Sequence, residues 1–217
     1  MPQPFPRNLE NPQLQIGDAS KQRPDLFMRG MAVIAHHSQV DAVLNTAMVH
    51  LLGTDPEPGL IMLSAINNNN IKQKAYTELA KNRLSNEDLI IFEGVLAACA
   101  AADKERNRLA HDLWATEAQL PKSIVLVSSR EFSRIAVRFH MLRNVPDLSE
   151  EIGEQLVAAI RASGLVYDRT DFVRIQEQMS HTFFLTVSLS IMLDHTTPDH
   201  EVTKQRVQLQ SALQKGH

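Results

Sequence analysis

Residues 86–115 constrain the fold more than any other part of the sequence, because strong helix formers dominate them. Leu, Ala, Glu, Lys and Arg predominate, and no proline follows before Pro121. At the usual helical rise, such a helix would be about 45 Å long. A helix of that length needs other helices to cover its apolar stripe, so the segment predicts a helical bundle.

Apolar residues recur at helical spacing over several other segments. The first, residues 25–52, is followed by Gly53, where a glycine C-cap is expected. Ser85 and Asp88 stand where they can cap the start of the long segment. The other predicted helices are 71–83, 130–144, 148–163, 171–193 and a polar terminal one at 199–214.

Strand signals are few. Residues 124–127 are short, β-branched and bounded by polar residues, and residues 165–167 could pair with them. The expected fold class is therefore all-α, a bundle of long helices with at most a minor two-stranded β element.

Three regions follow from this pattern. Residues 1–24 carry five prolines and little apolar surface, so we expect an N-terminal arm that is disordered or lies on a partner. Residues 25–195 form the helical domain. Residues 196–217 form a polar C-terminal helix or tail.

The chain has 217 residues with 22 basic and 25 acidic side chains, a formal net charge of -3. Binding to phosphates must then come from local basic clusters. No apolar run is long enough to span a membrane and no signal pattern begins the chain, so we expect no membrane association. The single cysteine, Cys99, excludes an internal disulfide and multi-cysteine zinc sites, which favours a cytoplasmic protein with Cys99 buried as a small apolar residue.

One motif suggests chemistry: Arg106-Asn107-Arg108-Leu109-Ala110-His111, or R-N-x-x-x-H, near the end of the longest predicted helix. Residues four apart share a helical face, so Asn107 can hold the His111 ring while Arg106 reaches toward both. A histidine, with an ordinary pKa near 6.5, moves protons at neutral pH, and an arginine stabilises charge on phosphate oxygens. The set suits phosphodiester cleavage without a metal. The alternative is a surface helix end whose histidine only favours the helix dipole.

This motif, with Asp112-Leu113-Trp114 after it, resembles the signature of the HEPN superfamily of small helical bundles: an arginine, a polar residue, and a histidine four to six positions after the arginine. The resemblance extends more loosely over residues 25–193. Many such domains resemble metal-independent endoribonucleases that act as homodimers, with two signatures meeting in one cleft. It implies Arg106 and His111 as catalytic residues, Asn107 as their polar support, and no cofactor. Asp112 stands where a glycine often follows the histidine.

The resemblance also implies RNA as the substrate and allows a regulatory or antitoxin partner. Some members have lost activity, so a catalytically inactive helical dimer that binds RNA, a nucleotide or a protein is the alternative. We expect the homodimer interface near residues 106–114, with Trp114 either anchoring it or packing in the core of one chain. The third hypothesis is that the chain is a structural or regulatory interaction module in which the motif occurs by chance.

Two further groups of arginines are candidates for RNA binding. Arg130, Arg134 and Arg138 recur every four residues and would form one basic stripe on a helix, which can follow a phosphate backbone. Arg108 belongs to a smaller cluster with Lys104 and Arg106, offset by neighbouring acidic residues. Solvated helix faces give the same patterns.

Histidine is a common metal ligand, and two groups of residues in the sequence contain several of them. His36 and His37 with His50, or Asp194 and His195 with His200 and Glu201, lack metal-ligand spacing, so we predict no metal site. The methionines are spread through apolar faces, which predicts core positions for Met28, Met31, Met48, Met62, Met141, Met179 and Met192.

Overall fold

The computed structural model describes residues 1–9, 12–66, 68–142 and 148–215. The described residues form nine helices: α1 (Ala19–Gln22), α2 (Pro24–Leu52), α3 (Pro56–Ser64), α4 (Asn69–Arg83), α5 (Asn86–His111), α6 (Ser129–Leu142), α7 (Leu148–Ser163), α8 (Arg169–Leu193) and α9 (Asp199–Lys215). Most helices lie where the spacing of apolar residues predicts them. Within this part of the chain, no helix is both long and apolar enough to cross a bilayer.

The sheet contradicts the predicted fold class. Five antiparallel strands in the order β1-β5-β4-β3-β2 exceed the minor two-stranded element that the sequence suggests. They are β1 (Gln3–Pro4), β2 (Leu14–Ile16), β3 (Leu113–Glu117), β4 (Ile124–Val127) and β5 (Leu165–Tyr167). The expected pairing of β4 with β5 is confirmed, with Val125 opposite Val166. The fold therefore combines helices with a small sheet, and an all-α description is wrong.

Two features of the chain account for the missed strands. β1 and β2 are two and three residues long and lie in the proline-rich N-terminal region, so neither gives a periodic signal. β3 follows α5 with a gap of one residue, Asp112, and no glycine or proline separates them. The predicted helix consequently ran on to residue 115, whereas α5 ends at His111. The N-terminal region thus supplies both edge strands of the sheet.

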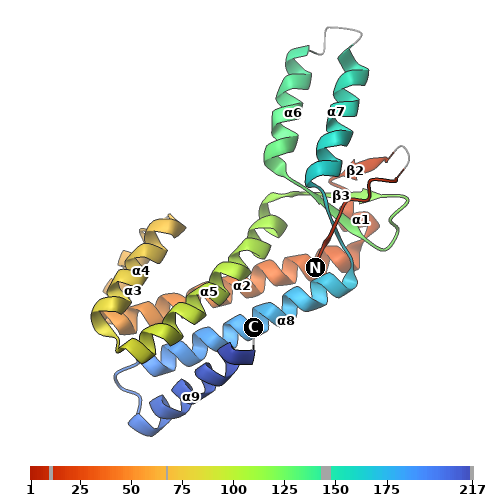
Figure 1. The fold of residues 1–217 in the computed structure, drawn as a ribbon. Helices are drawn as coiled ribbons and strands as arrows, with labels where there is room; N and C mark the ends of the chain where they lie inside the picture. Colours follow the sequence, from red (N-terminus) through yellow and green to blue (C-terminus); the bar gives the residue numbers. More distant parts are fainter. Residues whose placement is uncertain (10–11, 67, 143–147, 216–217) are drawn as a thin grey trace. The chain divides into compact units, whose positions relative to one another are not determined.

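The chain folds into two compact units, each built from separate segments. Unit 1 comprises residues 1–34 and 104–176, and unit 2 comprises 35–103 and 177–217. Unit 1 holds the sheet and the pair α6 and α7, which lie side by side (Figure 1). A cluster of buried apolar residues lies on the sheet and includes Phe5, Ala115, Val125, Val127 and Ile160.

Unit 2 is helical and has its own core, which includes Met48, Phe92, Leu185 and Leu209. The predicted terminal helix contributes Leu209, which is fully buried. The methionine prediction is only partly right. Met48, Met179 and Met192 are buried, but the side chains of Met28, Met31 and Met62 are 63%, 42% and 48% exposed. The side chain of Met141 lies outside the described residues.

Candidate functional site

The R-N-x-x-x-H motif lies at the end of α5, in unit 1. Asn107 and His111 are exposed, and their spacing places them on the same face of the last turn. Arg106 is partly buried on the adjacent face. The three residues predicted to be catalytic therefore share the last two turns of one helix, with the amide and the imidazole open to a ligand.

Trp114 holds this helix end in place. Its indole Nε1 donates a hydrogen bond to the Leu109 carbonyl oxygen at 2.8 Å, which satisfies one of the carbonyls left unpaired at a helix C-terminus. The indole ring stacks on Phe172 with 6.3 Å between ring centroids and meets the Phe27 ring edge-on at 5.3 Å. Trp114 thus packs inside unit 1, the second of the two roles expected for it.

Acidic groups surround the motif. Glu105 pairs with Arg108 at 3.3 Å and accepts a hydrogen bond from the Tyr167 hydroxyl at 3.4 Å. Burial raises the pKa of Tyr167 above its usual range, and the Glu105 charge adds to the effect, so the hydroxyl stays protonated as a donor. Arg108, predicted to bind RNA, is consequently held by a carboxylate of its own helix.

Asp112 follows His111 directly and is partly buried. Burial raises the pKa of its carboxyl group, while a hydrogen bond from the Ser129 backbone and the charges of Arg108 and His111 act in the opposite direction. Negative charge at this position would compete with a phosphate for the same cations. The charge of the Asp112 carboxyl group therefore affects how strongly the candidate site attracts a phosphate.

The predicted basic stripe lies on α6, in unit 1. Arg130 and Arg134 are exposed one turn apart, as the spacing predicts. Arg134 lies 3.6 Å from Glu131 and is itself 79% exposed, so this pair contributes little stability and leaves the guanidinium accessible. The side chain of Arg138 lies outside the described residues.

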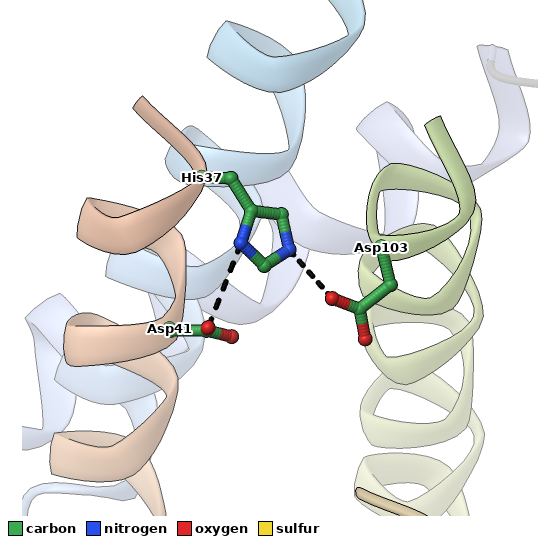
Figure 2. Close-up of side chains that lie close together, drawn as sticks. All are labelled: His37, Asp41 and Asp103. Atoms are coloured by element: carbon green, nitrogen blue, oxygen red, sulfur yellow. Dashed lines mark ion pairs between the residues drawn. The ribbon is translucent and has the colours of Figure 1, made fainter. Parts of the chain in front are cut away.

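A second cluster, which sequence reasoning missed, lies in unit 2. Figure 2 shows the His37 imidazole of α2 between two carboxylates, with Asp41 on one side and Asp103 of α5 on the other. Nδ1 lies 3.5 Å from Asp41 Oδ2, and Nε2 lies 2.7 Å from Asp103 Oδ1. His37 is 2% exposed. The spacing of His37 and Asp41 by four residues was the available signal, whereas nothing local marks Asp103.

Each of these three residues offers one ligand atom, and the three atoms lie within 4.8 Å of one another. Together they form a set of one nitrogen and two oxygens, which divalent cations accept as ligands. Within the described part of the chain, no other group of three such residues meets this distance. Each ring nitrogen already faces a carboxylate, however, so the same geometry links α2 to α5 through the buried His37 side chain. A cation would have to replace at least one of those contacts.

Of the histidines that the sequence offers as candidate ligands, His37 belongs to this cluster, whereas His36 and His50 have other partners. The His36 ring packs against Phe183 with 5.6 Å between centroids, and His50 Nδ1 lies 3.8 Å from Asp194 Oδ1. Glu201 instead accepts hydrogen bonds from Lys204 and Gln205 within α9. His36, His50 and Glu201 are thus engaged with partners outside the cluster.

Comparison of the chain with protein families, with curated proteins and with solved structures finds no match. The likeness to the HEPN superfamily therefore rests on the residues of the α5 motif.

Proposed function

We propose that the chain is a metal-independent endoribonuclease of the HEPN type that acts as a homodimer. The observation that supports this most is the exposed pair Asn107 and His111 at the end of α5, with Arg106 on the adjacent face. The two exposed groups of the motif are thus accessible to a polymer from solvent.

In this proposal the ribose 2′-hydroxyl of the substrate attacks the adjacent phosphorus atom. His111 carries a proton between the attacking hydroxyl, the solvent and the leaving 5′ oxygen, and Arg106 neutralises charge on the phosphate oxygens. Asn107 orients the imidazole. The products are a 2′,3′-cyclic phosphate and a free 5′-hydroxyl, so atoms balance without a metal or a cofactor.

The neighbouring arginines divide into two groups. Arg108 is held by Glu105, so it positions the helix end more than it binds substrate. Arg130 and Arg134 are exposed and can follow the backbone beyond the cleaved bond. Replacing both by glutamine is expected to weaken RNA binding and reduce its dependence on salt, while cleavage at saturating RNA changes little.

The test is cleavage of a mixed RNA pool by the purified chain and by single variants. His111→Ala should lower the rate by about a hundred- to ten-thousandfold, as expected for a lost proton carrier. Arg106→Lys should also be costly, because an ammonium group cannot form the fork of two hydrogen bonds that a guanidinium makes. Asn107→Ala should lower the rate less.

The matched control is His200→Ala, which removes an exposed histidine from α9 and should leave cleavage unchanged. Chelator should also have no effect. Undiminished cleavage by His111→Ala, or loss of cleavage with chelator, would disprove the mechanism. RNA binding without cleavage by the unaltered chain would instead favour the inactive binding dimer, for which the Asp112 carboxyl beside His111 supplies a physical reason.

A further inference from the structure

Unit 1 contains a cavity of about 670 Å³, here called the basic cavity. Four cationic side chains line it, and the described lining residues include one carboxylate, that of Asp25. The cations come from the start of α2, the start of α8 and the turn between β3 and β4: Arg23, Arg29, Lys122 and Arg169. Segments far apart in the sequence thus bring like charges to one hollow.

These charges are poorly compensated by the protein. Among the described residues, none of the four cations forms an ion pair with a carboxylate; Arg29 instead donates to Gln176 Oε1 at 3.4 Å. Nearby carboxylates are engaged elsewhere: Asp18 pairs with Lys21 at 3.6 Å and Asp171 pairs with Arg174 at 3.5 Å. Like charges in one cavity repel each other, so a bound anion would relieve the repulsion.

Arg23 provides an independent sign of a missing acceptor. Its Nε atom is buried and has no hydrogen-bond partner among the described residues, although its Nη1 donates to the Gln22 carbonyl oxygen at 2.8 Å. An unsatisfied buried donor is costly, and more so when it is charged. An anion in the basic cavity offers the acceptor that the chain itself does not.

The lining also contains an apolar side. Pro24, Met28 and Ala32 lie along the first turns of α2, and the Met28 side chain is 63% exposed. A methionine thioether is flexible and polarisable, which suits contact with a ligand of variable shape. A ligand that fills this cavity should therefore carry an apolar group beside its negative charge.

We propose that the basic cavity binds a small organic phosphate with two or three linked phosphate groups. The cluster of cations matches a polyanion better than a single charge. The volume falls within the roughly 300 to 1,000 Å³ typical of small-molecule sites, which is more than one phosphate group needs. The proposal is independent of the proposed function, since Arg106, Asn107 and His111 do not line the cavity.

Isothermal titration calorimetry of the full chain at low ionic strength tests the ligand class. The probes are orthophosphate, inorganic triphosphate, ATP and a short single-stranded RNA, with the His111→Ala variant used so that RNA remains intact. We expect ATP to bind several-fold more tightly than triphosphate, and orthophosphate at least tenfold more weakly than triphosphate. Equal binding of ATP and triphosphate would refute the inference that the ligand is an organic phosphate with an apolar group against Pro24, Met28 and Ala32. Binding of RNA alone, or of no probe, would refute the proposal, and none of these results bears on cleavage by His111.

Two exposed cations, Lys122 and Arg169, locate the site without disturbing the core. Lys122→Gln and Arg169→Gln should each weaken ATP binding by about ten- to a hundredfold, the loss of one charged hydrogen bond. The control is Lys21→Gln, which removes the same charge from a neighbouring, 84% exposed side chain outside the lining and should change affinity less than twofold. An equal loss in all three variants would show only nonspecific attraction to charge and overturn the site.

Discussion

Trp114 and Gly30 determine how closely α2 approaches the aromatic cluster of unit 1. A Cβ atom placed on Gly30 would lie 2.2 Å from the far carbon of the Trp114 ring and 3.2 Å from Phe172. A glycine inside a helix ordinarily costs about 0.5 to 1 kcal/mol relative to alanine. At position 30, however, only glycine leaves room for the Trp114 ring.

We therefore expect Gly30→Ala to destabilise the chain, opposite in sign to its usual effect in a helix. Overpacking should cost about 1 to 3 kcal/mol in the free energy of unfolding, measured by denaturant titration. Gly94→Ala in α5 is the control, because its new methyl group would meet the flexible end of Leu213. Adding Trp114→Phe should recover part of the loss; a neutral Gly30→Ala would contradict the packing.

Cys99 gives a prediction that depends on pH. Burial raises the pKa of its thiol to about 12, and the charges of Asp103 and Asp41 contribute. Because the folded pKa exceeds the unfolded one, the associated stability is complete below the unfolded value of 9.0 and is lost as the pH rises toward 12.

At about pH 8 the folded chain should react with iodoacetamide about a thousandfold more slowly than the unfolded chain, since only the thiolate reacts. Mass spectrometry of the alkylated fraction over time measures both rates. Similar rates in the presence and absence of denaturant would show that the thiol is accessible.

At the scale of single helices, the start of α5 shows what sequence can predict. Ser85 and Asp88 were expected to cap it, and they do: the Asp88 backbone N–H donates to Ser85 Oγ at 3.2 Å, and Ser85 Oγ lies 3.0 Å from Asp88 Oδ2. Arg206 of α9 also binds Asp88, through Nε at 2.7 Å. Capping follows from residues three apart, whereas the arginine is brought in by tertiary packing and leaves no local signal.

The same distinction applies to the candidate site. Helical spacing alone was enough to place Asn107 beside His111. The approach of Asp103 to His37 and the packing of Trp114 depend on how elements distant in sequence fold together. β3 was missed for a related reason: its residues are compatible with helix, and pairing with β2 and β4 determines their conformation.

The two carboxylates beside His37 should contribute unequally to the stability of the link between α2 and α5. Asp103 is 19% exposed and its oxygen lies 2.7 Å from Nε2, whereas Asp41 is 52% exposed at 3.5 Å from Nδ1. Double-mutant cycles of His37→Gln with Asp103→Asn and with Asp41→Asn measure each contribution. We expect a coupling of about 1.5 to 3 kcal/mol for Asp103 and below about 1 kcal/mol for Asp41. Equal couplings would contradict the geometry.

At the scale of the whole molecule, neither compact unit is a continuous piece of chain. The boundaries fall within α2 and α8 and in α5 after Asp103, so each unit is assembled from two segments that are separated in the sequence. A division into arm, central domain and tail, as drawn from composition, does not reveal this arrangement. Contacts between distant segments define the units, and composition carries no record of them.

The proposed homodimer belongs to this scale, and we expect light scattering to report a dimer at high micromolar concentration. Ala110 is exposed beside His111, so Ala110→Arg should place two like charges near the two-fold axis and weaken association at least tenfold. Ala65→Arg, the same change at an exposed residue of unit 2, should leave the dimer intact. A chain that stays monomeric would exclude a site shared by two copies.

The short outer strands of the sheet limit how copies of this chain can associate. β1 has two residues, one of which is Pro4 and has no backbone N–H to donate, and β2 has three residues and is followed by Gly17 with φ of 88°. Fibrous aggregates grow by adding strands to a long, regular edge, and neither edge provides one. Neither described edge of the sheet therefore offers a template on which further chains could add strands in a crowded solution.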